Sequence, residues 1–301
     1  MEEDKKYTNV DTMASPNNQI SSTRMNTITK TKQSYGVACC RISTLGVPEI
    51  LLIQKRHTYS FVTFVFGCDY LHNHKQLRKL FDTMTQQEKL DILRLDYENL
   101  WCQICGKIPV QPPFDKYGKN RETPAHKHFN KAASKRNYSL SSWDAYIQRK
   151  SSFDTQYAGD NRVLSKLIHG TKSVNTLWDI PKGRRKTPEE KTFDIAIREL
   201  KEETSATILD ITPMFHITPI INCYIDGKWK YINTYFVAEA DSQVWKPVVN
   251  FLSHDQMTEV QDIQWFCLAR LKALDPSSKY HQRLINIVEI ILKKYKKARK
   301  T

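Results

Sequence analysis

The sequence predicts an α+β fold in which an all-α domain is inserted into a domain built around a sheet. Runs of β-branched and aromatic residues, which are typical of strands, recur within residues 34–68 and 172–301. Residues 69–171, between them, carry apolar side chains at helical spacing and form the expected inserted domain. Residues 1–33 are rich in Ser, Thr, Asn and Lys without apolar periodicity, so we expect a disordered or loosely attached tail.

Composition indicates a basic, packed, intracellular protein. The 301 residues are 40% hydrophobic and 11% aromatic, which favours a globule over a disordered chain. The net charge of +14 and the pI of about 9.3 favour polyanionic partners such as RNA, DNA, inositol polyphosphates or acidic lipid. We expect no membrane span and no secretion signal, because no apolar run reaches about eighteen residues. Seven cysteines, an odd number, fit a reducing compartment.

Two strands and an aromatic run begin the sheet domain. Residues 34–42 and 49–56 form the strands, and Gly46 with Pro48 supplies a turn between them. Residues 57–67 are strongly aromatic and β-branched, and we interpret them as a buried strand.

Four helices are expected in the inserted domain. Residues 76–84 form a short amphipathic segment. Thr85 and Glu88 form a capping box that opens a longer helix as far as Trp101. A third helix is expected within 123–150, around Trp143, and a fourth over 161–168.

The stretch 116–150 interleaves many basic side chains with aromatic ones. This pattern suits a flexible polyanion, because cations bind phosphates and bases stack on aromatic rings. The alternative is a solvated helix face over core aromatics. The candidate RNA-binding residues are Lys127, Lys131, Lys135 and Arg136.

The strands resume after residue 206. Residues 211–221 are a strand region, and residues 222–225 pair with 229–238 through a turn at Asp226-Gly227. A last strand covers 260–266. The closing helix, 282–297, ends in a lysine-rich run that is either a solvated helix terminus or a second RNA contact.

The chemistry is concentrated in residues 178–206. Residues 187–190, Thr-Pro-Glu-Glu, predict a helix start, with a capping hydroxyl, a proline at the first position and acids in the first turn. On that helix Glu199, Glu202 and Glu203 share one face. Clustered carboxylates repel one another, and Mg²⁺ prefers carboxylate oxygens, so we predict a metal site.

This segment resembles the Nudix box, whose pattern is Gly-x5-Glu-x7-Arg-Glu-U-x-Glu-Glu-x-Gly-U, with U a bulky aliphatic residue. The matching residues are Gly183, Glu190, Arg198, Glu199, Leu200, Glu202, Glu203 and Ala206. Six residues, rather than five, separate Gly183 from Glu190, so Glu189 competes for that position. Ser205 stands where the second glycine, a left-handed turn residue, is expected.

The resemblance implies an α/β/α sandwich with a mixed sheet and a metal-dependent pyrophosphohydrolase. Mg²⁺ or Mn²⁺ would bridge pyrophosphate oxygens, and Arg198 would orient a glutamate of the box. The implied catalytic and metal-binding residues are Glu199, Glu202, Glu203, Arg198, Gly183 and Glu259. Asp262 is the second candidate for the role of Glu259 as base or further ligand. Candidate phosphate-binding residues are Lys182, Arg184, Arg185 and Lys186.

A closer resemblance, over residues 34–270, is to the mRNA-decapping Nudix enzymes of large cytoplasmic DNA viruses. It rests on residues 34–37, 59–67, 84–89, 100–101 and 178–184 and on the helical insertion. It implies cleavage of capped mRNA in the host cytoplasm to 7-methyl-GDP and 5′-monophosphate RNA. The cap base would lie between aromatic rings in a cation–π arrangement. The candidates are Tyr59, Phe61, Tyr231 and Tyr235, and core packing is the alternative for each.

Other functions remain open. A Nudix hydrolase of diphosphoinositol polyphosphates or dinucleoside polyphosphates would not require the basic insertion. A non-catalytic RNA-binding module would have no use for carboxylates that repel phosphate. Cys102 and Cys105 with His126 and His128 have the residue types of a zinc site, although the cysteines continue a helical apolar pattern.

Overall fold

One mixed sheet joins the N-terminal strands to the strands that follow residue 177. The computed structural model describes residues 30–67, 73–108, 143–157, 161–226, 229–240, 245, 247–274 and 279–300. The strands are β1 (Lys30–Ile42), β2 (Pro48–Lys55), β3 (Trp178–Asp179), β4 (Lys182–Gly183), β5 (Ile211–Pro213), β6 (Ile220–Asp226), β7 (Trp229–Ala240) and β8 (Val260–Cys267). Their order is β3-β2-β1-β7-β5, with β4 beside β1, β6 beside β7 and β8 beside β2. The pair β1–β7 is parallel, and the other pairs are antiparallel.

Strand β1 begins earlier than predicted, at Lys30 rather than Ser34. Lys30 pairs with Trp229 at the start of the parallel ladder to β7, so backbone groups expected in the tail have partners in the sheet. The Lys32 ammonium also lies 3.9 Å from the Trp229 ring centroid. The predicted tail, 1–33, is therefore wrong at its C-terminal boundary, and residues 1–29 lie outside the described residues.

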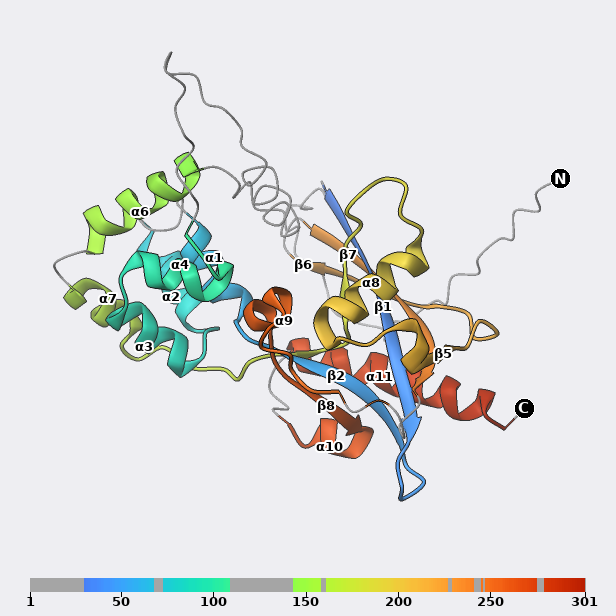
Figure 1. The fold of residues 1–301 in the computed structure, drawn as a ribbon. Coiled ribbons are helices and arrows are strands. Elements are labelled where there is room, and N and C mark those ends of the chain that lie inside the picture. The colour runs from blue at the N-terminus through green and yellow to red at the C-terminus, as the bar shows by residue number, and fades with distance from the viewer. Residues whose placement is uncertain are drawn as a thin grey trace, which may run out of the picture.

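The two faces of the sheet are covered by different helices. Along β1, Val37 and Cys39 face one core while Ala38 and Cys40 face the other, as the alternation of a strand requires. Helix α8 (Thr192–Thr204) packs on the first face and helix α11 (Lys279–Ala298) on the second. Figure 1 shows these two helices flanking the strands. The layers agree with the predicted α/β/α sandwich.

All the elements described between β2 and β3 are helices. They are α1 (Tyr59–Phe66), α2 (His74–Phe81), α3 (Gln86–Arg94), α4 (Tyr97–Cys105), α6 (Trp143–Tyr157) and α7 (Asn161–Ile168). They enclose an apolar core of their own, in which Phe61, Trp101 and Tyr146 are buried. Figure 1 shows them gathered on one side of the molecule. The predicted bounds of α7 and the capping box of Thr85 with Glu88 are confirmed.

The predicted strand at residues 57–67 is wrong, because this segment forms helix α1. The Thr58 hydroxyl caps the helix by accepting a hydrogen bond from the Phe61 amide at 3.2 Å. Phe61, Phe64 and Val65 are buried at helical spacing in the helical core. Tertiary packing of this stripe therefore overrides the strand propensity of aromatic and β-branched residues.

The predicted long helix from Thr85 to Trp101 is two helices, α3 and α4. Helix α3 ends at Arg94, and Asp96 caps α4 by accepting a hydrogen bond from the Asn99 amide at 2.8 Å. An aspartate that binds a nearby backbone amide favours a new helix start over a continuous helix.

The second part of the sheet follows the prediction with one interruption. Residues 211–221, expected as one strand region, form β5 and β6 around a turn in which the Ile217 amide donates to the Met214 carbonyl. Strands β6 and β7 pair as predicted, and Gly227 of the expected turn lies outside the described residues. Two short helices, α9 (His254–Glu259) and α10 (Leu268–Lys272), were not predicted. Within the described residues, no helix is long and apolar enough to cross a membrane.

Candidate active site

The loop before α8 is held by a carboxylate, and the helix begins later than predicted. Residues 187–190 form a turn, and α8 starts at Thr192 with Lys191 as its N-cap, without a side-chain cap. The Glu190 carboxylate accepts from the Lys186 amide at 2.6 Å and from Arg198 Nε at 2.8 Å. These bonds hold the Thr-Pro-Glu-Glu segment as a loop against α8. The segment therefore does not start the helix, although its residues are typical of a helix start.

Arg198 connects this loop to the acidic side chains of α8. Its Nη2 donates to the Arg184 carbonyl at 2.9 Å, and its Nη1 contacts the carboxylates of Glu199 and Glu202. Its hydrogen bond to Glu190 is the main cause that lowers the pKa of that carboxyl to about 2. Of the two candidates for the first glutamate position of the box, Glu190 contacts Arg198, whereas Glu189 is exposed.

The three glutamates of α8 lie on one face, and each is held by a cation. Glu199 is held by Arg198, and Glu202 by Lys186 and Arg198. Glu203 is buried, and it accepts from Lys55 Nζ at 2.6 Å and from the Lys182 amide at 3.0 Å. Within the described part of the chain, no three acidic, histidine or cysteine side chains already converge as metal ligands.

Gly183 leaves the space in which the Glu199 carboxylate lies. A Cβ atom at Gly183 would overlap all the atoms of that carboxylate group. The strand pair of Gly183 with Tyr35 fixes this position in the sheet. The box glycine thus brings β4 against the acidic face of α8.

The end of α8 and the short helix α9 bring a further carboxylate to this site. Ser205 ends α8 with φ of 59°, the left-handed conformation expected at this position, and its hydroxyl accepts from Gln256 of α9 at 2.7 Å. Glu259, at the end of α9, is close enough to raise the pKa of both Glu203 and Lys55. Asp262 instead binds the Ile263 amide of its own strand. Of these two candidates, only Glu259 acts on the charge of Glu203.

The pKa values of Glu203 and Lys55, which form a buried pair, are both raised. Burial raises the pKa of Glu203 to about 7; Lys55 opposes this rise, and Glu199 and Glu259 add to it. Burial alone would lower the pKa of Lys55, but Glu203 and its acidic neighbours raise it above its ordinary value. Lys55 therefore stays charged, while Glu203 takes a proton far more readily than an exposed glutamate.

Glu203 should make the stability of the free protein depend on pH. Its folded-state pKa of about 7 exceeds the ordinary value of 4.5, so the folded state binds more protons than the unfolded state between these values. Below pH 4.5 this group contributes on the order of 3 kcal/mol to the free energy of unfolding. This contribution is lost as the pH rises through 7. Urea unfolding across this range measures the change. Glu203→Gln, which cannot titrate, should show a weaker dependence, and an unchanged dependence would contradict this pKa.

The side chains of the predicted phosphate-binding residues point in different directions. The Lys182 ammonium is turned inward to Asp179, which also accepts from Tyr280 Oη at 2.5 Å. Lys186 binds Glu202, and exposed Arg185 donates to the Pro188 carbonyl at 2.7 Å. The Lys186 side chain therefore borders the acidic face, whereas that of Lys182 is turned to Asp179 and that of Arg185 to the Pro188 carbonyl.

The predicted cap-binding aromatic residues differ in how exposed their rings are. Phe61 and Tyr235 are buried in the cores and have no ring face open to a base. Tyr59 is 57% exposed, and half-buried Tyr231 stacks on Tyr224 with centroids 4.9 Å apart and planes at 8°. Tyr59 and Tyr231 are therefore the two candidates with accessible rings.

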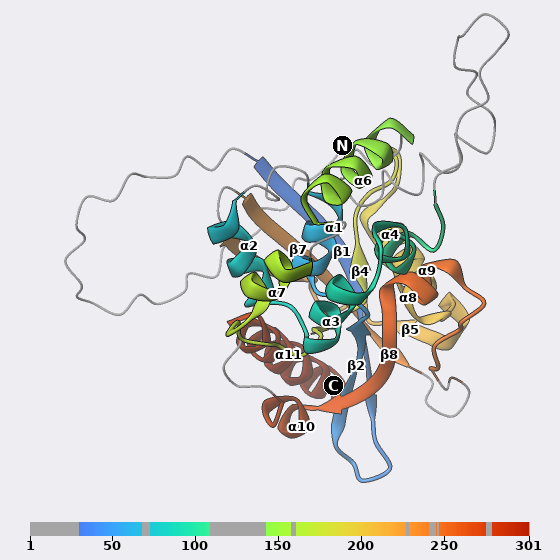
Figure 2. The ribbon, with the colours of Figure 1, turned by 90° about the vertical axis from the view of Figure 1, so that its left-hand side faces the viewer.

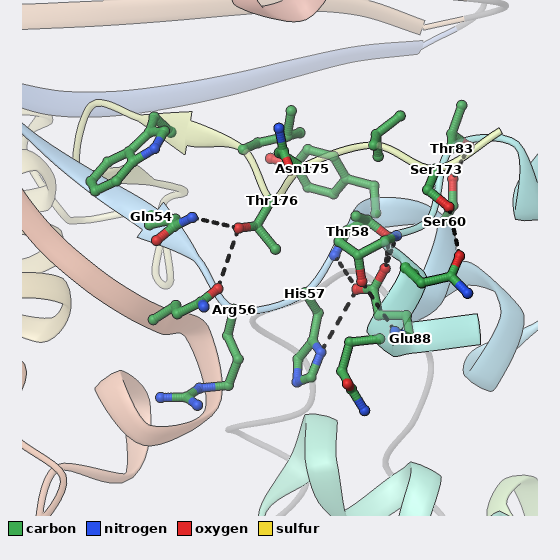
Figure 3. Close-up of a pocket in the computed structure, with 18 of the residues that line it drawn as sticks. Gln54, Arg56, His57, Thr58, Ser60, Thr83, Glu88, Ser173, Asn175 and Thr176 are labelled. Atoms are coloured by element: carbon green, nitrogen blue, oxygen red, sulfur yellow. Dashed lines mark hydrogen bonds and ion pairs between the residues drawn. The ribbon is translucent and has the colours of Figure 1, made fainter. Parts of the chain in front are cut away.

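A cleft of about 1530 Å³, which the sequence did not predict, opens between the helices and the sheet. Tyr59 lines it, and so do many amide and hydroxyl side chains (Figure 3). Beside Tyr59, buried Glu88 accepts from the Thr58 amide at 2.6 Å, the Thr58 hydroxyl at 2.8 Å and the Thr85 amide at 2.8 Å. Only the capping-box spacing of Thr85 and Glu88 marked this network in the sequence.

The two sides of the cleft meet where α4 contacts α9. Figure 2, viewed from the helical side, shows these helices next to each other. The His254 ring nitrogen lies 3.1 Å from the Cys105 carbonyl at the end of α4. The helix that carries Glu259 is thus in contact with the helical elements.

Comparisons with known proteins decide the family. No protein-family model matches the chain. The mRNA-decapping protein g5R of African swine fever virus, isolate Pig/Kenya/KEN-50/1950, is 31% identical over 268 residues, 86% of this chain and 93% of the relative. This chain belongs to the g5R family of Nudix hydrolases. The g5R of isolate Tick/South Africa/Pretoriuskop Pr4/1996 is 30% identical over 249 residues, 80% of this chain and 86% of the relative. A solved structure of a C. elegans Ap4A hydrolase binary complex aligns with 12% sequence identity and a TM-score of 0.37. The alignment covers 86% of this chain and 96% of the solved chain.

Several predicted residues cannot be placed at this Nudix site. Lys127, Lys131, Lys135 and Arg136 lie outside the described residues, as do His126 and His128. Cys102 and Cys105 lie on α4, and both are half-buried.

Proposed function

We propose that this protein is an mRNA-decapping hydrolase. It cleaves a pyrophosphate bond of the 5′ cap and yields 7-methyl-GDP and RNA with a 5′-monophosphate. The observation that carries this proposal is the acidic face of α8, where Arg198, Lys186 and Lys55 hold Glu199, Glu202 and Glu203. Identity of 30–31% to viral decapping proteins over most of the chain supports the choice of capped mRNA as substrate.

The residues that would hold Mg²⁺ or Mn²⁺ are Glu199, Glu202, Glu203 and Glu259. Their carboxylate oxygens are the donors that these hard cations prefer, and Gly183 gives Glu199 the room it needs. When bound, the metal supplies Lewis-acid activation of the phosphoryl oxygens and lowers the pKa of the attacking water. Three cations already neutralise the acidic face and keep its carboxylates in place: Arg198 on Glu199 and Glu202, Lys186 on Glu202, and Lys55 on Glu203.

The other residues of the box orient the reacting groups. Arg198 is fixed by Glu190 and by the Arg184 carbonyl, so it holds Glu199 and Glu202 on the acidic face. Glu259 is the proposed general base, because it ends α9 next to the buried pair of Glu203 and Lys55. Arg185 and Lys186 are the proposed phosphate-binding cations at the rim.

The cap base is proposed to bind between Tyr59 and the ring pair of Tyr231 and Tyr224. The pKa values of Tyr224 and Tyr280 on the sheet side are raised mainly by burial, and the Tyr59 hydroxyl adds to each. Tyr59 and Tyr280 both line the cleft. A methylated, positively charged base between such rings gains cation–π attraction.

The helical elements between β2 and β3 are proposed to be an inserted RNA-binding domain. Its separate core, its place between two strands of the sheet and the +14 charge of the chain support this role. Lys127, Lys131, Lys135 and Arg136 remain the proposed RNA contacts. The proposed site of action is the host cytoplasm, where capped mRNA is translated.

A decapping assay tests the proposal. Purified protein is incubated with Mn²⁺ or Mg²⁺ and RNA labelled at the cap phosphate. The expected result is labelled 7-methyl-GDP whose release a chelator blocks. Cleavage of a dinucleoside polyphosphate or a diphosphoinositol polyphosphate, with capped RNA left intact, would contradict decapping and favour a small-molecule Nudix hydrolase.

A further inference from the structure

Ser205 stands where the Nudix pattern has its second glycine, and the proposed hydrolysis makes no use of its side chain. With φ of 59°, it is the only non-glycine residue of positive φ in the part of the chain that the structure describes. A left-handed serine costs free energy that a glycine would avoid. The hydroxyl supplies what a glycine lacks, a hydrogen-bonding group at the end of α8.

The partner of this hydroxyl is Gln256 of α9, whose side chain is fully buried. Gln256 Oε1 accepts from the Asn250 backbone amide at 2.7 Å. Because a backbone amide can only donate, this bond fixes the orientation of the side-chain amide, and Nε2 is left to donate to Ser205 Oγ at 2.7 Å. A glycine at position 205 would remove the acceptor of a buried NH₂ group, which costs free energy in turn. The serine and the glutamine therefore match each other.

Two other contacts hold α9, which ends at Glu259, to elements other than α8. At the end of β2, the Arg56 backbone amide donates to the Glu259 carbonyl at 3.0 Å, and Arg56 Nη2 donates to the Val260 carbonyl at 2.8 Å. At the start of α9, the His254 ring lies against the Cys105 carbonyl of α4. The helix is thus held at both ends, and the bond from its glutamine to the end of α8 is a third anchor, toward the acidic helix.

This third anchor joins two segments that each carry a carboxylate of the proposed site. Glu203 lies two residues before Ser205, and Glu259 lies three residues after Gln256. About one helical turn or less of backbone therefore separates each end of the bond from its carboxylate. The charge of Glu259 acts on Glu203, so the two carboxylates lie within electrostatic range of each other. The bond therefore helps to set the spacing between them.

We propose that Ser205 and Gln256 are positioning residues, which hold α9 against the end of α8 and thereby fix the Glu259 carboxylate relative to the metal-binding glutamates. The inference rests on the proposed function, because it takes Glu259 as the general base. A base must lie within hydrogen-bond reach of the water whose proton it accepts. A displacement of α9 by about 1 Å is therefore enough to slow the reaction.

The test uses Ser205→Gly, which restores the residue of the Nudix pattern and removes only the hydroxymethyl group. The loss of one hydrogen bond and the relief of a left-handed backbone are similar in size, so the urea midpoint should move little. The kcat for release of 7-methyl-GDP should fall roughly tenfold to a hundredfold, while the KM for capped RNA stays within about twofold. A purely structural role would not lower kcat at unchanged stability and KM.

Hydrogen–deuterium exchange follows the same variant without catalysis. In metal-free Ser205→Gly, the backbone amides of α9 should exchange roughly tenfold faster than in the wild type, because one anchor of this helix is lost. The amides of α11, on the other face of the sheet, should keep their wild-type rates.

Gln256→Met removes the other half of the pair and should lower kcat as well. It also leaves the Asn250 amide without its acceptor, so this variant should be less stable in urea. Adding Ser205→Gly to it should cause little further loss of kcat, because the bond is already absent. Gln282→Met is the matched control, since Gln282 is exposed on α11, donates to Asn286 at 3.1 Å and should retain activity.

The Glu259→Gln background shows whether the pair acts through this carboxylate. Ser205→Gly should add little to the loss already caused by Glu259→Gln, measured in single turnovers. An undiminished additional loss in that background, a wild-type kcat in Ser205→Gly, or full activity of Glu259→Gln would each overturn the positioning role while decapping stands.

Failure of decapping itself has a different signature. In that case the wild-type protein releases no 7-methyl-GDP from capped RNA, and hydrogen exchange decides the role of the pair. Faster exchange confined to α9 in Ser205→Gly supports the anchor between α9 and α8, and unchanged exchange overturns it.

Discussion

Replacing Glu202 by Gln should reduce the release of 7-methyl-GDP on the order of a thousandfold. The Glu202 carboxylate lies on the acidic face of α8, where Lys186 and Arg198 hold it. An amide of the same shape can still accept from both cations, so the fold and the loop should remain intact. It lacks the negative charge that a divalent metal requires, and loss of one such electrostatic contact at a reaction centre costs roughly a hundred- to a thousandfold in kcat.

Two measurements show whether this loss is catalytic. RNA binding, followed by fluorescence anisotropy, should be unchanged or slightly tighter in Glu202→Gln, because one negative charge near the RNA is removed. Glu189→Gln is the matched control, since it makes the same charge change on the exposed neighbour of Glu190 and should retain activity. Full turnover by Glu202→Gln would show that the metal site is assigned to the wrong carboxylates.

The acidic face could be predicted because it depends on local spacing. Glu199, Glu202 and Glu203 are close in sequence, and any α-helix over them brings their side chains to one face. The start of that helix could not be predicted in the same way. The Thr-Pro-Glu-Glu signals at residues 187–190 are local, whereas the bonds from Arg198 to Glu190 that hold the loop come from the following helix.

Helices α1 and α9 show where local patterns fail. Residues 59–66 have the composition of a strand, and the helical core that buries Phe61 and Phe64 includes partners far along the chain, such as Phe153. Gln256 of α9 lies 51 residues after its partner Ser205, and no motif marks the short helix that brings them together. The chemistry of the box was therefore predictable, while the shape of the substrate site was not.

Replacing Gly183 by Ala should abolish most activity with little loss of stability. The new Cβ would overlap the Glu199 carboxylate, and this carboxylate ends a flexible side chain that can rotate away. The energetic cost to the fold is therefore small, but Glu199 leaves the acidic face and its contact with Arg198. We expect kcat to fall roughly a hundredfold or more, as for other losses of a charge-stabilising group, with weaker Mn²⁺ binding by calorimetry.

Gly46→Ala is the matched control for this substitution. Gly46 lies in the β1–β2 turn with φ of 72°, and its added Cβ would meet no atom within 4 Å. It should lower the free energy of unfolding by about 1 kcal/mol, the cost of a left-handed alanine, and leave activity unchanged. A double-mutant cycle then tests the cause, because Gly183→Ala should add little to the defect of Glu199→Gln if both act through the same carboxylate. Additive losses in that cycle would show that the glycine acts through β4 itself, and an active Gly183→Ala protein would show that Glu199 does not need this space.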